Sequence, residues 1–227
     1  MADPEQRRQA LTDTRRALVL DAARAVFQEA GLGGANMREI ARRAGYTPGA
    51  IYSYFDSKEA IYGALLAESL ERLNTAVDGA VLRASNPASN PATNLATNPA
   101  NAANAAATLR ASARAWFDFY RHNPRDLDLG FYLVQGLAER GLTPDLNRSL
   151  NSRLHDALAA GERALLALGA DDSSARAETT ALFAQGMGLL LLHHTGRITL
   201  FGQDADALFD QYLTGLVGRW PGPASPA

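Results

Sequence analysis

Apolar residues recur at intervals of three and four along most of this chain, the spacing that places side chains on one face of an α-helix. No stretch alternates apolar and polar residues as a half-buried strand would. We therefore predict an all-α fold of about nine helices. The clearest periodic run ends at Gly31 and consists of Leu18, Val19, Ala22, Ala23, Val26, Phe27 and Ala30.

Two short helices are predicted after Gly31 from their start signals. Asn36 stands three residues before Glu39, a variant of the capping box in which Asn accepts from exposed amides and Glu reaches back. Thr47 precedes Pro48, and proline at the first helical position sacrifices no hydrogen bond. These signals predict helices from Met37 to Gly45 and from Pro48 to about Phe55.

Longer helices are predicted in the rest of the chain. Ser57 is the expected cap of a helix with the apolar face Ile61, Leu65, Leu66, Leu70, Leu73, Val77 and Val81. Five more helices are expected, over 109–122, from Pro124 to Glu139, and over 144–168, 174–195 and 204–217. Residues 84–107 are rich in Ala, Asn and Pro, so we expect a mobile low-complexity insertion, with Ala102–Ala107 open to joining the next helix.

Charge is distributed unevenly along the chain. The net charge is −2, yet residues 7–58 hold nine basic and five acidic side chains. We expect a basic module over 1–58 that meets phosphates, an acidic body over 59–220 and a flexible tail over 221–227.

Composition excludes several classes of function. Hydrophobic residues make up 47% of the chain and charged residues 20%, which is typical of a globular protein. With no cysteine and only four histidines, we expect no disulfide, no metal site, no cofactor and no catalytic constellation. His193 and His194 are adjacent and point in different directions on a helix, which argues against a metal pair. The longest apolar run, Met187–Leu192, is too short to span a bilayer, so a cytoplasmic location without membrane contact is expected.

The two short helices and the Gly45 turn between them indicate a helix-turn-helix, with the second helix as the major-groove reader. The stretches Met-Arg-Glu-Ile-Ala-Arg-Arg-Ala-Gly (37–45) and Thr-Pro-Gly-Ala-Ile-Tyr-Ser-Tyr-Phe-Asp-Ser-Lys-Glu-Ala-Ile (47–61) resemble the TetR family of transcriptional regulators. The match covers about residues 12–62. Tyr46 departs from the family pattern, which usually has a smaller aliphatic residue there.

The resemblance implies an N-terminal three-helix DNA-binding domain and a C-terminal helical domain for ligand binding and dimerisation. It implies phosphate contacts from Thr47, Tyr52, Tyr54 and Lys58, with Pro48, Gly49 and Ala50 nearest the bases. Arg38 would hold the DNA backbone or reach a base. No Arg, Asn or Gln occupies the base-facing positions, so part of the specificity is expected from DNA shape.

We expect a ligand-responsive repressor, not an enzyme, that binds a palindromic double-stranded DNA operator as a homodimer and is released by a small, mostly apolar effector. The alternative is a helical small-molecule-binding protein or enzyme with a vestigial DNA-binding module. The expected dimer interface comprises Ala181, Ala184, Gln185, Gly188, Leu192, Leu208, Phe209, Tyr212 and Leu216. Effector-binding residues are expected to be Trp116, Tyr120, Phe131 and Gln185, although an aromatic stripe fits a plain core equally well.

Overall fold

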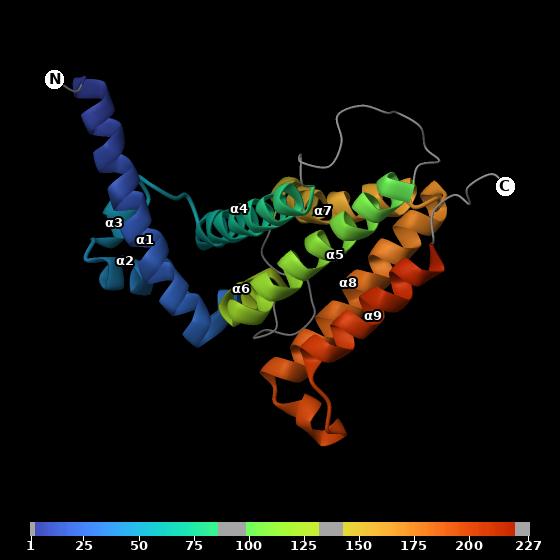
Figure 1. The fold of residues 1–227 in the computed structure, drawn as a ribbon. Helices are drawn as coiled ribbons and strands as arrows, with labels where there is room; N and C mark the ends of the chain where they lie inside the picture. The colour runs from blue at the N-terminus through green and yellow to red at the C-terminus, as the bar shows by residue number, and fades with distance from the viewer. Residues whose placement is uncertain (1–2, 86–98, 132–142, 221–227) are drawn as a thin grey trace. The chain divides into compact units, whose positions relative to one another are not determined.

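The computed structural model describes residues 3–85, 99–131 and 143–220, and all regular structure within these ranges is helical (Figure 1). The all-α prediction is confirmed. The described helices are α1 (Pro4–Gly34), α2 (Met37–Ala44), α3 (Pro48–Ile51), α4 (Lys58–Ala84), α5 (Pro99–His122), α6 (Pro124–Phe131), α7 (Pro144–Ala167), α8 (Asp172–His194), the 3-10 helix η1 (Arg197–Phe201) and α9 (Ala205–Arg219).

The predicted caps of the helix-turn-helix are confirmed. The Asn36 side chain accepts from the Glu39 amide at 2.9 Å. The Thr47 hydroxyl accepts from the Ala50 amide at 3.3 Å. Gly45, the residue after α2, has φ +75°, a left-handed conformation that favours glycine. Polar side chains thus satisfy amides that the first turn of each helix leaves unpaired.

Two helix boundaries in the N-terminal part differ from the prediction. The first helix begins at Pro4, because Asp3 accepts from the Glu5 amide and proline fits the first turn. The periodic residues from Leu18 onward mark only its buried part. Helix α3 ends at Ile51 and continues as hydrogen-bonded turns, in which the Phe55 amide donates to the Ile51 carbonyl at 3.1 Å.

In the expected insertion, residues 99–107 belong to α5, and 86–98 lie outside the described residues. The same holds for the expected helix beyond residue 131 up to Glu139 and for the tail. The 3-10 helix η1 was not predicted. It stands between Gly196 and Gly202, which have φ +69° and +60°.

The chain divides into two compact units. The first comprises Met1–Ser69 and Arg125–Asn151, and the second Leu70–Pro124 and Ser152–Ala227. Residue 58, the expected end of the N-terminal module, falls inside the first unit, which also takes in a later segment. Helix α4 contributes residues to both units.

Helices α1, α2 and α3 pack together in the first unit around a small apolar core. Ile40 and Ile51 are fully buried, and Phe55 nearly so. Phe27 and Tyr62 meet edge to face with ring centroids 5.3 Å apart, which joins α1 to α4. The Tyr62 hydroxyl also donates to the Leu129 carbonyl of α6.

An ion-pair cluster fastens α2 to α1. Arg43 donates to Glu29 on α1 at 2.5 and 2.7 Å and to Glu39 at 2.7 Å. Arg42 also donates to Glu39, at 2.7 and 2.9 Å. The Glu39 carboxylate therefore faces two guanidinium groups rather than reaching back to the Asn36 amide as expected. These hydrogen bonds lower the pKa of Glu39 to about 2.

The core of the second unit is aromatic and joins α5, α8 and α9. Phe117 and Phe209 stack with ring centroids 4.0 Å apart, and Trp116 contacts Phe183 at 5.3 Å. At Gly186 on α8, an added Cβ would lie 2.2 Å from a ring atom of Trp116. Only glycine allows α8 to approach this ring so closely.

We predict that Gly186→Ala lowers the free energy of unfolding by about 1–3 kcal/mol, because its methyl group overpacks the core. Gly79→Ala in α4 is the matched control, since only the flexible end of Arg83 lies near its Cβ, at 3.3 Å. That control gains helix propensity and should be neutral or stabilising by up to about 1 kcal/mol. Urea unfolding measures both, and equal stabilities would contradict the predicted close contact at Trp116.

We also predict a pH dependence from Glu39. Because its pKa is lower in the folded state, its stabilisation is fully present above the unfolded pKa of ~4.3 and is lost as pH falls toward about 2. The stability advantage of the wild type over Glu39→Gln should therefore be constant above pH ~5.5 and shrink below it. Urea unfolding at successive pH values measures it. In the Arg43→Gln control, the Glu39 pKa measured by NMR should rise, and an unchanged value would refute this cause.

Candidate nucleic-acid interface

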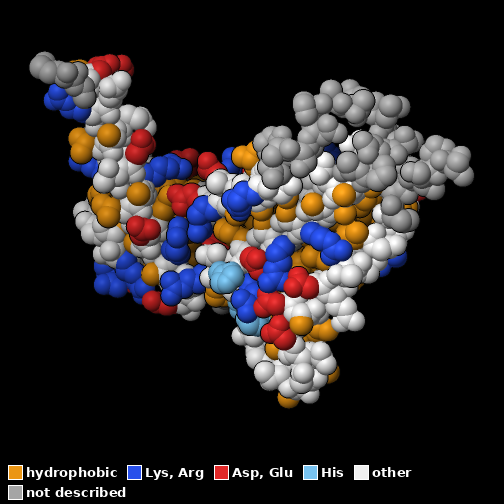
Figure 2. All heavy atoms as spheres, viewed as in Figure 1, with side chains coloured by type: hydrophobic (Ala, Val, Ile, Leu, Met, Phe, Trp, Pro, Cys, Tyr) orange, Lys and Arg blue, Asp and Glu red, His pale blue; other side chains and the backbone are white. Residues whose placement is uncertain are grey.

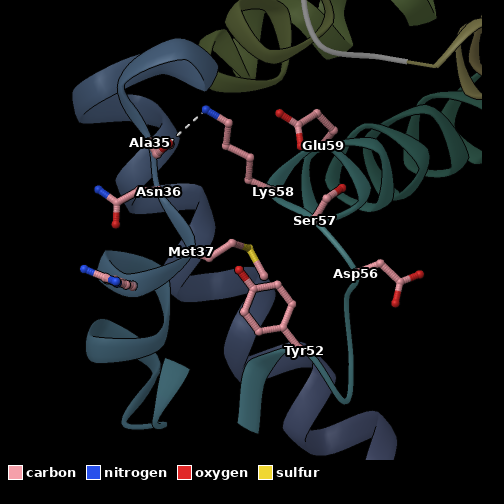
Figure 3. A pocket seen from close by; sticks show the side chains of 9 residues that line it. Ala35, Asn36, Met37, Tyr52, Asp56, Ser57, Lys58 and Glu59 are labelled. Atoms are coloured by element: carbon pink, nitrogen blue, oxygen red, sulfur yellow. Dashed lines mark hydrogen bonds between the residues drawn. The ribbon is translucent and has the colours of Figure 1, made fainter. Parts of the chain in front are cut away.

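A surface hollow of about 660 Å³ lies in the first unit, beside the start of α2 and the start of α4 (Figure 3). It brings together three of the predicted DNA-binding residues, Arg38, Tyr52 and Lys58. The other lining residues are Ala35, Asn36, Met37, Asp56, Ser57 and Glu59. Two of these, Asn36 and Ser57, are the residues whose side chains cap α2 and α4.

The N-terminus of α3 presents the small residues predicted nearest the bases. Thr47, Pro48 and Gly49 are exposed, and Ala50 is half-buried. A Cβ added at Gly49 would meet nothing within 4 Å. Small side chains leave the backbone of this turn accessible, so a large partner can approach it closely.

The two predicted tyrosines differ in their surroundings. Tyr52 is 53% exposed, which is unusual for a large aromatic ring and suits contact with a partner. Tyr54 is half-buried, and its ring centroid lies 6.0 Å from that of Tyr46, the residue that departs from the family pattern. The Tyr54 hydroxyl accepts from Arg15 at 3.5 Å, and this hydrogen bond raises the Arg15 pKa.

Lys58 makes intramolecular contacts that the sequence did not predict. Its ammonium donates to the carbonyl of Leu32 at 2.8 Å. It also donates to the carbonyl of Ala35 at 3.0 Å (Figure 3). These carbonyls lie around the end of α1, where helix carbonyls lack intrahelical partners and a cation is favourable. Lys58 therefore ties the start of α4 to the end of α1, in addition to any contact with phosphate.

Most other basic side chains of residues 7–58 also make contacts within the chain. Arg42 and Arg43 pair with acids, and Arg24 pairs with Glu68 at 3.3 Å. Arg16 donates to the Tyr54 carbonyl at 3.0 Å and lies over the Phe55 ring. Lys and Arg side chains accordingly gather over the α1–α3 surface among acidic ones (Figure 2). Within the described part of the chain, the exposed Arg38 guanidinium has no such partner, which leaves it available.

The predicted effector residues belong to both compact units. Trp116 and Tyr120 are buried in the second unit, where Trp116 contacts the rings of Phe117, Phe183 and Phe209. Gln185 is exposed on α8, and Phe131 belongs to the first unit.

The predicted dimer residues fall into two groups. Ala181, Ala184, Gln185 and Gly188 are exposed on α8, while Leu192, Leu208 and Tyr212 are half-buried. Phe209 and Leu216 are fully buried within the protomer. We correct their assignment to the core, because a side chain already covered by its own chain offers no surface to a partner.

A second hollow, of about 480 Å³, was missed from the sequence. It is lined by Val81, Asn101, Asn104, Ala105, Thr108, Ala160, Arg163, Ala164 and Ala167. Its residues come from α4, α5 and α7, and alanines form much of its lining. The sequence offers little to predict this hollow, because a run of alanines in a low-complexity stretch does not indicate one.

Two further findings concern metals and membranes. The described residues contain no group of three or more His, Asp or Glu side chains placed to hold a metal ion. His194 instead lies 3.1 Å from the Tyr120 carbonyl through its Nε2 atom. None of the described helices is long and apolar enough to cross a membrane.

Comparison with known proteins identifies the N-terminal part. The family model "Bacterial regulatory proteins, tetR family" matches residues 19–65. The HTH-type transcriptional activator FasR of Mycolicibacterium smegmatis is 34% identical over 119 residues, which are 52% of this chain and 46% of FasR. The HTH-type transcriptional repressor KstR of the same organism is 34% identical over 73 residues, 32% of this chain and 36% of KstR. The chain thus spans less than half the length of either relative.

The fold extends the likeness beyond the N-terminal part. The transcriptional regulator FadR from Bacillus subtilis, solved in complex with stearoyl-CoA, matches with a TM-score of 0.60 over 88% of this chain and 97% of FadR. At 21% sequence identity this likeness concerns the fold alone. Residues 19–65, which include the helix-turn-helix and its caps, thus match the TetR family of bacterial regulatory proteins.

Proposed function

We propose that this protein is a transcriptional repressor that binds a palindromic DNA operator as a homodimer and is released by a small, mostly apolar effector. The observation that carries the proposal is the capped helix-turn-helix with an exposed α3 N-terminus. The names of FasR and KstR show that matched relatives include an activator and a repressor.

The proposed DNA contacts come from the start of α2, α3 and the turns after α3. The exposed Pro48 and Gly49 and the half-buried Ala50, all small residues, would face the base edges. Thr47, Tyr52 and Tyr54 would contact phosphates. Arg38 is the strongest candidate for a phosphate or base contact, because its guanidinium is exposed and has no partner within the described part of the chain.

We predict that the protein protects a palindromic site in the DNA flanking its own gene, as measured by footprinting. On the protected duplex, Arg38→Ala should weaken binding at least tenfold and leave the melting temperature unchanged, because the Arg38 guanidinium makes no hydrogen bond or ion pair within the described residues. Lys58→Met should weaken binding and also lower the melting temperature, because it loses the Leu32 and Ala35 contacts. Full affinity in Arg38→Ala would contradict the proposed site.

Dimerisation is proposed through α8 and α9. The exposed residues Ala181, Ala184 and Gly188 on α8, with Gly215 and Gly218 on α9, let another helix approach closely. A Cβ added at any of these three glycines would meet nothing within 4 Å, so the protomer leaves this space open.

We predict that sedimentation equilibrium of the DNA-free protein gives twice the chain mass of 24.2 kDa. Ala184→Glu should give the single-chain mass and lose operator binding, because one half-site provides little affinity. Arg153→Glu, an exposed change on α7, is the control and should remain dimeric. A monomeric wild type at micromolar concentration would refute the dimer.

The effector is proposed to bind the second unit and to carry a long acyl chain. The aromatic cluster around Trp116 and the alanine-lined hollow beside Arg163 are both suited to apolar groups, and Arg163 suits an anionic one. The stearoyl-CoA complex of FadR supplies the chemical precedent. If the effector binds the DNA-free protein more tightly than the DNA-bound protein by ~1–3 kcal/mol, it would lower operator affinity about 5- to 150-fold.

We predict that stearoyl-CoA weakens operator binding, and that operator DNA weakens stearoyl-CoA binding by the same factor. The chain has two tryptophans, so in a Trp220→Phe variant the fluorescence reports Trp116 alone. A fluorescence change on titration would favour the aromatic cluster as the site. If stearoyl-CoA leaves the Trp116 fluorescence unchanged and no longer weakens operator binding in Arg163→Gln, the hollow is favoured as the site. Unchanged operator affinity would exclude this class of effector and leave DNA binding untouched.

A further inference from the structure

No side chain in the first half of α1 is buried. Every residue from Asp3 to Leu18 is exposed, and the first buried residue of α1 is Val19. This half of α1 extends past α2 and α3 (Figure 1). An isolated helix of about fifteen residues is marginally stable in water, and most helices in proteins depend on packing against an apolar face. A helix half that buries nothing within its own chain therefore has a surface available for a partner.

The side chains of this segment are sorted by charge. Five residues at helical spacing share one face, which we call the basic stripe, and they are Arg7, Arg8, Leu11, Arg15 and Leu18. Asp13 lies on the other side of the helix, where it accepts from Gln9 at 2.9 Å. The stripe is therefore positively charged and free of acids. Leu11 and Leu18, 58% and 50% exposed, lie among the arginines.

The basic stripe is continuous with the candidate nucleic-acid interface. Arg15 donates to the Tyr54 hydroxyl at 3.5 Å, and the neighbouring Arg16 donates to the Tyr54 carbonyl at 3.0 Å. The turns that follow α3 are thus joined to the basic stripe through Tyr54. Arg8 lies two helical turns before Arg15, about 10 Å along the axis at 1.5 Å per residue.

We infer that the basic stripe is a second DNA-contacting surface, which binds backbone phosphates beyond the segment read by α3. The inference rests on the proposed function, because it assumes that α3 docks on DNA. Charge complementarity selects the partner. The arginines of the basic stripe lie on an exposed helix face that holds no acid, which suits a polyanion. Because Arg15 contacts Tyr54, this polyanion would be the same duplex that α3 binds. Phosphate contacts carry no sequence information, so the stripe adds affinity and register rather than specificity.

The test is the salt dependence of binding to the footprinted duplex, measured by fluorescence anisotropy for wild type, Arg8→Ala and Arg8→Ala/Arg15→Ala. Each phosphate contact contributes about −0.9 to the slope of log K against log salt, so each one lost should cost about eightfold in affinity at 0.1 M salt. Alanine has the highest helix propensity, so the helix should persist, as circular dichroism can verify. Arg153→Ala on α7 is the matched control, with the same charge change at an exposed site outside the stripe, and should keep the wild-type slope.

The outcomes separate the inference from the proposed function. Wild-type slope and affinity in the double variant, with weakened binding in Arg38→Ala, would overturn the stripe and leave the proposed function intact. An unchanged slope with an altered sedimentation coefficient of the DNA-free variant would identify the stripe as a contact between two copies of the chain and would also overturn it. A wild type that protects no DNA would remove both proposals.

Discussion

The packing of two very short helices against α1 is the constraint on which the rest depends. Helix α2 has eight residues and α3 has four, far below the length at which an isolated helix is stable in water. Their geometry is therefore set by burial of Ile40, Ile51 and Phe55 and by the Arg43 bridge between Glu29 and Glu39. These contacts fix the angle between the two helices, and the exposed α3 N-terminus follows from that angle.

Much of this arrangement was predictable from the sequence. Start signals such as Asn36 and Thr47-Pro48 act through neighbours three residues away, so local sequence determines them. The Asp3-Pro4 start is the same kind of signal, but no apolar periodicity follows it, because residues 3–18 are exposed on every side of the helix.

Features that depend on distant parts of the chain were not predictable. The role of Lys58 requires knowing that the carbonyls around the end of α1 lie beside it, and the sequence holds no local trace of that proximity. The burial of Phe209 similarly depends on Phe117, which lies in a helix far away in the sequence. Among periodic apolar residues, pattern alone does not distinguish a side chain that faces its own core from one that faces a second copy.

The first compact unit is discontinuous in sequence, and this has a consequence during synthesis. Contacts from Tyr62 to Leu129 and from Gly63 to Leu146 join its two segments. Ribosomes add about 5–20 residues per second, so the second segment follows the first by roughly three to eleven seconds. The N-terminal helices must wait over that interval with Tyr62 and Gly63 uncovered. Nascent chains are then open to chaperone binding at this site, and a pause in translation between the segments would prolong the exposure.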